Sequence, residues 1–204
     1  MVDESFNFHL ENLKKLQIDL EKQMLRFDEI IPYERQETAR IYSPRLLNMM
    51  LACCPQIEAV TNLISTKCNF SGNGIPTLIG KINKKAVLSN FQIISIPHKL
   101  LFTPFPKELS WWQAYNKLKH ELTGKQFKLT YTIVMDAFAA LAGLHCLSEK
   151  LVSCSDDRVP ITLDRKNWTN DYEDMKTIVM ARGKKDPYPT YKSLMFEVKT
   201  VLSN

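Results

Sequence analysis

Apolar residues recur every three or four positions along the first thirty residues, and charged residues stand between them. This spacing predicts a long amphipathic helix over residues 6–30, which ends at or before Pro32 because proline cannot continue a helix. Ser43 and Pro44 are typical of a helix start, as an N-cap followed by a first-turn proline. A second helix is therefore expected from this point through Ile64.

The pattern changes between residues 69 and 105. The run SGNGIP at residues 71–76 has turn chemistry, and short apolar or β-branched runs follow it, separated by Asn, Lys and Pro. We therefore expect a small β-hairpin or extended excursion at about residues 75–104.

Helical spacing returns near Glu108 and predicts four further helices. The first runs to about His120, and the second, over roughly residues 130–152, is apolar on nearly all sides, which is typical of the central helix of a bundle. The last two follow Asn170 and Thr190. The expected fold is a mainly α, single-domain helical bundle over residues 1–204 with a minor β element.

Composition adds little to this picture. The chain is 45% hydrophobic and 24% charged, as in ordinary soluble globular proteins. At 204 residues it buries roughly 70% of its surface on folding, enough to need no disulfide or metal. The net charge of +5 is compatible with a polyanionic partner and does not require one.

The first residues, the longest apolar run and the cysteines together predict a cytoplasmic protein. Acidic residues stand where a signal peptide would carry lysines, and Asp136 and His145 interrupt the longest apolar run, so neither export nor a membrane span is expected. The five cysteines have no metal-ligand spacing with any histidine, so no metal or other cofactor is expected.

Candidate chemistry lies in residues 111–124, WWQAYNKLKHELTG, since Gly-rich phosphate loops, HExxH, CxxC pairs and GxSxG are absent from the sequence. On a helix, one stripe of this segment faces the core; it consists of Trp111, Tyr115, Leu118 and Leu122. Asn116 and His120 are one turn apart on a different face, with Trp112 beside them.

This second face carries groups suited to RNA. The imidazole of His120 can exchange protons near neutral pH, and the Asn116 amide can orient it or bind a phosphate oxygen. Lys117 and Lys119 supply positive charge for a phosphodiester, and Trp112 offers a plane on which a base can stack. The alternative is a solvated helix face without function, which is the commoner role of a single exposed Asn/His pair.

Three features follow one another within residues 40–152: a Ser-Pro-started helix ending in PQIEAVTNLI, the motif NKLKH, and the apolar helix DAFAALAGLHCL. This order resembles the HEPN superfamily, small helical bundles of bacterial toxins, phage-defence proteins and some RNases. The resemblance implies that His120 is the catalytic histidine and Asn116 the polar residue of a metal-independent ribonuclease site, formed by two copies across a dimer interface. Tyr115 stands where the family has an arginine, and Lys117 or Lys119 replaces that cation only in part.

Two functions follow from the resemblance. The first, favoured because of Tyr115, is a non-catalytic or weakly active RNA- or partner-binding homodimer, linked to phage defence or toxin systems. The second is a metal-independent endoribonuclease that uses His120 at a dimer interface. In both, Trp112, Tyr115, Lys117 and Lys119 are the residues expected to contact the substrate.

Other residues have structural interpretations that are favoured over functional ones. Small residues form a stripe along the central helix that ends at Gly143, and internal packing is favoured over a dimer seam there. His145 is expected in the core and His98 in a loop near the β excursion. Glu58 is expected to approach the face that carries Asn116 and His120.

Overall fold

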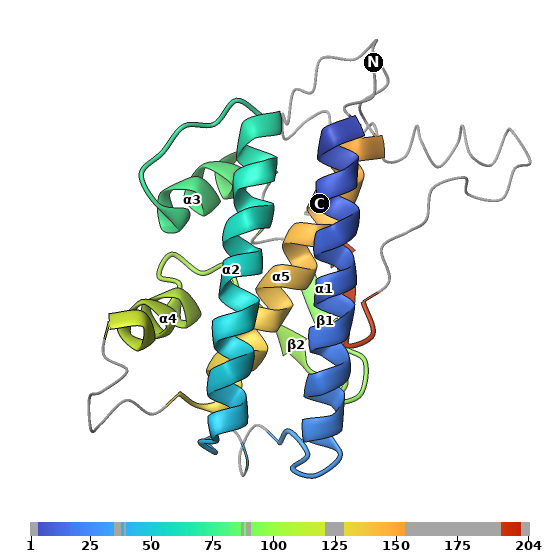
Figure 1. The fold of residues 1–204 in the computed structure, drawn as a ribbon, viewed down its shortest axis with the longest axis vertical. Helices are drawn as coiled ribbons and strands as arrows, with labels where there is room; N and C mark the ends of the chain where they lie inside the picture. The colour runs from blue at the N-terminus through green and yellow to red at the C-terminus, as the bar shows by residue number, and fades with distance from the viewer. Residues whose placement is uncertain are drawn as a thin grey trace, which may run out of the picture.

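The computed structural model describes residues 4–34, 38, 40–86, 88, 91–120, 129–153 and 193–200. Over these residues the protein is mainly helical, as predicted, with a small antiparallel sheet (Figure 1). The elements are α1 (Glu4–Asp28), α2 (Pro44–Lys67), α3 (Ile75–Ala86), β1 (Phe91–Ser95), β2 (Leu101–Phe102), α4 (Ser110–His120), α5 (Tyr131–Ser153) and β3 (Phe196–Thr200).

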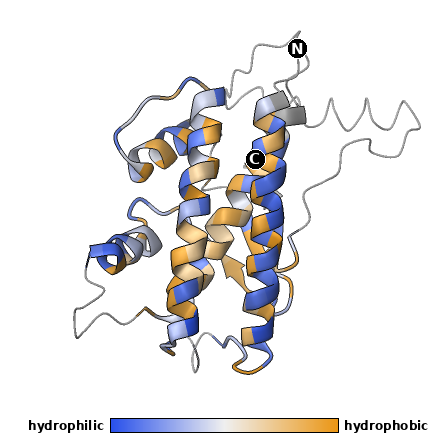
Figure 2. Ribbon diagram, in the orientation of Figure 1, coloured by the Kyte–Doolittle hydropathy of each residue, from blue (hydrophilic) through white to orange (hydrophobic). Residues whose placement is uncertain are grey.

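Helix α5 lies at the centre, as its apolar sequence predicts. It contacts α1, α2, α4, β1 and β3, and it is the most uniformly apolar of the described helices (Figure 2). By length and composition alone, the segment Tyr131–Glu149 could cross a membrane. The sequence predicts no such segment, because Asp136 and His145 interrupt the apolar run. Because 78% of that segment is buried inside the protein, packing in a core accounts for its hydropathy.

Helix α2 begins as the sequence predicts. The Ser43 Oγ accepts a hydrogen bond of 3.2 Å from the backbone N–H of Arg45, and Pro44 is the first helical residue. The side-chain oxygen thereby satisfies one of the N–H groups that a helix start leaves unpaired.

Residues 75–86 contradict the expected β excursion, because they form helix α3. Their buried residues are spaced at i, i+3, i+4 and i+7, which is a helical pattern: Ile75, Leu78, Ile79 and Ile82. Gly80 and the β-branched isoleucines have lower helix propensity than alanine or leucine, which favoured a strand in the sequence, but burial against α2 offsets this.

The hairpin part of the excursion is confirmed. β1 pairs antiparallel with β2, placing Ile93 opposite Phe102, and it pairs on its other side with β3, where Ile93 lies opposite Val198. One face of the sheet packs on α5, and Gly143 of α5 allows this approach. At Gly143 the small-residue stripe therefore serves internal packing.

The helix expected after Thr190 is wrong where residues 196–200 are concerned, because these form strand β3. The sequence FEVKT alternates apolar and polar residues, so it fits a half-buried strand as well as a helix stripe. The free edge of β1 supplies hydrogen-bonding partners that settle the choice. The helix expected after Asn170 lies outside the described residues.

A buried carboxylate ties the start of β3 to α1. Oε1 of Glu21 accepts hydrogen bonds of 2.7 Å from both Gln17 and the hydroxyl of Ser193, and Oε2 accepts one of 2.6 Å from the backbone N–H of Leu194. The Ser193 Oγ in turn accepts from the N–H groups of Met195 and Phe196. Burial raises the pKa of Glu21 above its usual 4.5, although these donors act to lower it.

The two described helical glycines should respond oppositely to alanine. A Cβ at Gly80 meets no atom within 4 Å, so Gly80→Ala should raise the free energy of unfolding by about 0.5–1 kcal/mol. A Cβ at Gly143 would lie 2.8 Å from Ile93 Cδ1 and 3.0 Å from Phe105 Cε2, both in the core, so Gly143→Ala should lower it by roughly 1–3 kcal/mol. Urea denaturation measures both, and a stabilising Gly143→Ala would contradict this packing.

Glu21 should make stability depend on pH. Because its pKa is raised in the folded state, the folded protein binds the proton more tightly, and the carboxyl contributes most below pH 4.5 and progressively less as the pH rises through the raised pKa. The stability of the wild type relative to Glu21→Gln should therefore fall from pH 4.5 upward. Denaturation at a series of pH values tests this; a constant difference would show that Glu21 titrates normally.

Candidate functional site

Helix α4 is held by an aromatic anchor. Trp111, Tyr115 and Leu118 are buried, as the helical projection predicts, whereas Leu122 lies outside the described residues. The indole N–H of Trp111 donates a hydrogen bond of 2.8 Å to the Pro104 carbonyl oxygen, which pairs the buried donor. The anchor fixes the orientation of α4 on the bundle.

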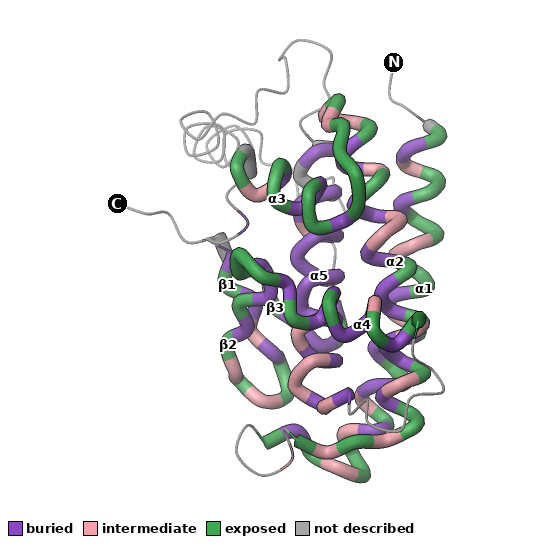
Figure 3. The backbone as a smooth tube through the Cα atoms, turned by 90° about the vertical axis from the view of Figure 1, so that its left-hand side faces the viewer, coloured by how far each residue is buried: buried purple, intermediate pink, exposed green. Residues whose placement is uncertain are grey.

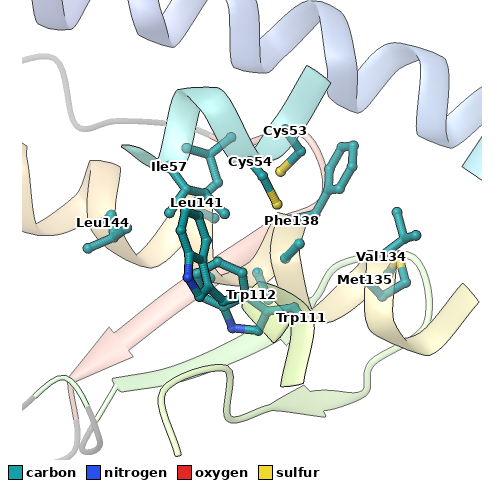
Figure 4. Close-up of a cluster of buried hydrophobic side chains, with 14 of the residues drawn as sticks. Cys53, Cys54, Ile57, Trp111, Trp112, Val134, Met135, Phe138, Leu141 and Leu144 are labelled. Carbon is teal, nitrogen blue, oxygen red and sulfur yellow. The ribbon is translucent and has the colours of Figure 1, made fainter. Parts of the chain in front are cut away.

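The expectation that Trp112 lies on an exposed face is wrong, because its side chain is only 8% exposed. Its ring centroid is 6.0 Å from that of Trp111 and 5.3 Å from that of Tyr115. Figure 4 shows both indoles in one cluster with Ile57 of α2 and Leu141 of α5. Since α4 packs against both α2 and α5, its buried arc is wider than one stripe, and Trp112 offers no plane for a nucleobase.

The polar candidates of α4 lie toward solvent. Asn116 is half-buried, and Lys117, Lys119 and His120 are exposed in the last turn. Cations in this position interact favourably with the negative end of the helix dipole. Within the described part of the chain no hydrogen bond joins Asn116 to His120, so the structure places this pair on one helix without linking the two side chains.

Glu58 of α2 reaches this face, as expected. Its Oε1 lies 3.9 Å from the Lys119 Nζ, and that ammonium group sits 5.0 Å from the centroid of the Tyr115 ring. Burial, followed by the charge of Glu58, raises the pKa of Tyr115, so the phenol stays neutral. Tyr115 is 4% exposed and therefore supplies neither the charge nor the access of an arginine at its position.

The charge distribution adds a signal that no single motif carries. Lys81 and Lys84, which the sequence favoured as solubilising loop residues over RNA-backbone contacts, lie on helix α3. Residues 59–120 contain eight lysines and a single acid, Glu108, a net charge of +7 against +5 for the whole chain. The remaining residues therefore carry −2. No aspartate or glutamate occurs between Glu58 and Glu108, a gap that a scan for missing acids would have found.

Folding gathers part of this segment on one side. α3 and α4 both pack on α2, on the side away from α1 in Figure 1, and both face the viewer in Figure 3. We call their exposed basic residues the α3–α4 basic face: Lys81, Lys84, Lys117, Lys119 and His120. Helix α1, on the opposite side, mixes five acidic residues with four basic ones.

A second polar cluster joins α1, the β1–β2 turn and α5. The Asp28 Oδ1 accepts hydrogen bonds of 2.9 Å from the Tyr33 N–H and 2.8 Å from the Tyr131 hydroxyl, and it lies 3.1 Å from His98 Nε2. His98 is in the turn after β1, as expected. Burial raises the pKa of Tyr131. Since Asp28 and His98 side chains are only 13% and 12% exposed, the cluster functions as an internal connection.

A buried histidine and two buried cysteines lie in the core. His145 is fully buried, as expected, and burial, with a smaller contribution from the charge of Lys14, lowers its pKa to about 3. Burial raises the pKa of the Cys53 and Cys54 thiols, which keeps them protonated. Among the described residues no group of three histidine, cysteine or acidic side chains is arranged to hold a metal ion.

Comparisons of the chain with protein-family models, curated proteins and solved structures gave no match. The candidate site is therefore defined by geometry and charge: an aromatic anchor that fixes α4, and a basic face that α4 shares with α3.

Trp112→Ala should destabilise the fold. Removing a buried aromatic side chain costs about 3–5 kcal/mol of unfolding free energy. The neighbouring exposed residue provides a matched control, since Gln113→Ala should change stability by no more than about 0.5 kcal/mol. Thermal denaturation followed by circular dichroism measures both. Equal melting temperatures for the two variants would contradict the burial of Trp112.

Proposed function

We propose that this chain is a non-catalytic RNA-binding protein of HEPN-like architecture that holds the phosphate backbone on the α3–α4 basic face. The observation that carries the proposal is the segregation of charge. The entire net positive charge of the sequence comes from residues 59–120, and lysines of this segment are exposed on two neighbouring helices. Phosphate neutralisation by such lysines is the main source of sequence-independent binding to nucleic acids.

The surroundings of the face support binding to a large anion. Lysines that only improve solubility are interspersed with acidic residues, as on α1. Helices α3 and α4 contain no acidic residues. The described acidic side chain closest to Lys119 is that of Glu58, on α2. The positive field on this side is therefore little compensated, which attracts polyanions and accelerates their association.

The burial of Tyr115 favours binding over catalysis. By the resemblance of the sequence to the HEPN superfamily, this position would hold the arginine that stabilises charge on the phosphate, and a buried neutral phenol does not replace it. His120 and Asn116 then contribute to the binding surface, the first as an exposed imidazole and the second as a half-buried amide. Pairing of two copies, as in that superfamily, is part of the proposal.

One observation favours a metal-independent endoribonuclease as the second candidate. His120 is exposed on the basic face, one turn from Asn116, where a bound phosphodiester would be within reach of a general acid or base. The two functions make different predictions for the fate of the RNA.

Neutralising Lys117 and Lys119 should weaken RNA binding. Lys117→Gln/Lys119→Gln should lower affinity several-fold and reduce the slope of log affinity against log salt by about 2, because two phosphate contacts are lost. The matched control is Lys15→Gln/Arg26→Gln, which removes two exposed charges from α1 and should leave binding nearly unchanged. Fluorescence anisotropy of a labelled RNA over a salt series gives both quantities.

The same samples separate the two candidates. Intact RNA after incubation with chelator agrees with a binding protein. Cleavage that His120→Ala abolishes without a change in melting temperature would identify the ribonuclease. Equal losses of affinity in the α4 and α1 double variants would reject the α3–α4 basic face.

A further inference from the structure

We infer that the RNA held on the α3–α4 basic face is double-helical and is recognised through its backbone. The inference rests on the proposed function and specifies its substrate class. It starts from what this face lacks, as well as from the lysines that it presents.

The aromatic residues of α4 are unavailable to bases. Proteins that bind single strands stack successive bases on exposed aromatic rings, which also supply much of the binding energy. On α4 all three aromatic side chains are at most 8% exposed: Trp111, Trp112 and Tyr115. The strongly exposed aromatic residues of the described chain, Phe8 and Tyr42, lie on α1 and immediately before α2.

The basic groups are suited to phosphates and poorly suited to base edges. Bidentate recognition of guanine relies on arginine, whose planar fork fits two acceptors, whereas a lysine ammonium acts as a point charge. Residues 59–120 contain eight lysines and no arginine. The face therefore favours contacts that depend little on nucleotide sequence.

The lysines are carried by helices that the core holds in place. α4 is fixed by its buried aromatic cluster and α3 by four buried apolar residues, and both helices pack on α2. Lysines whose backbone positions are fixed relative to one another suit phosphates that are themselves fixed in position, as in an A-form duplex. A flexible strand would have to be ordered on binding, without stacking to offset the cost.

The test compares three RNA probes of equal nucleotide number at one salt concentration: a blunt duplex, a second duplex of unrelated sequence, and oligouridine, which forms no duplex. The full chain should bind the two duplexes with equal affinity within about twofold, and oligouridine at least about tenfold more weakly, as expected without stacking. Lys81→Gln/Lys84→Gln should weaken duplex binding, and the control Lys15→Gln/Arg26→Gln should not.

The outcomes distinguish this inference from the proposed function. If oligouridine binds as tightly as the duplexes and the Lys117/Lys119 variant weakens it, the duplex inference is overturned and RNA binding on this face remains. A large preference between the two duplexes would also overturn the inference, because it would require reading of base edges. If none of the three probes binds, the proposed function fails as well.

Discussion

The burial of most of α5 is the constraint on which the rest of the structure depends. A helix that is apolar on most of its surface must be covered on most of its sides, and here α1 and α2, the sheet and α4 provide that cover. The close approach of β1 at Gly143 shows how tightly the cover fits. Because α4 takes part in it, three aromatic residues turn inward and the lysines in its last turn remain in solvent. The candidate site thus follows from how the core is closed.

Polar groups within the cover specify how its parts join. Glu21 connects α1 to the start of β3, and Asp28 connects the end of α1 to the β1–β2 turn and α5. Each carboxylate receives several donors, which offsets the cost of removing it from water. Such contacts are directional, unlike apolar packing, so they fix the position of the sheet against α1. These hydrogen bonds give Glu21 and Asp28 a structural role, which explains why two acidic side chains lie away from solvent.

The segregation of charge links the architecture to the proposed function. Mixed charges cover α1, whereas α3 and α4 carry lysines without acidic neighbours on the same helix. The difference is present in the linear sequence, but it acquires meaning only when α3 and α4 lie on the same side of the bundle (Figure 3). The same packing that hides Trp112 from nucleobases presents Lys117 and Lys119 to phosphates.

The sequence by itself determined the elements whose pattern has one interpretation: α1, the capped start of α2, the inward stripe of α4, and the apolar α5. It did not determine residues 75–86, where β-branched residues and a glycine favoured a strand although the apolar spacing is helical, or residues 196–200, where helix and strand periods both fit. Packing on α2 decided the first segment and pairing with β1 decided the second. Nor did it determine the burial of Trp112. A helical projection predicts one buried stripe, whereas α4 packs against both α2 and α5 and therefore buries a wider arc. Periodicity reports which side of an element is apolar; only the folded chain decides how many neighbours cover it, because contacts between distant segments are absent from any local pattern.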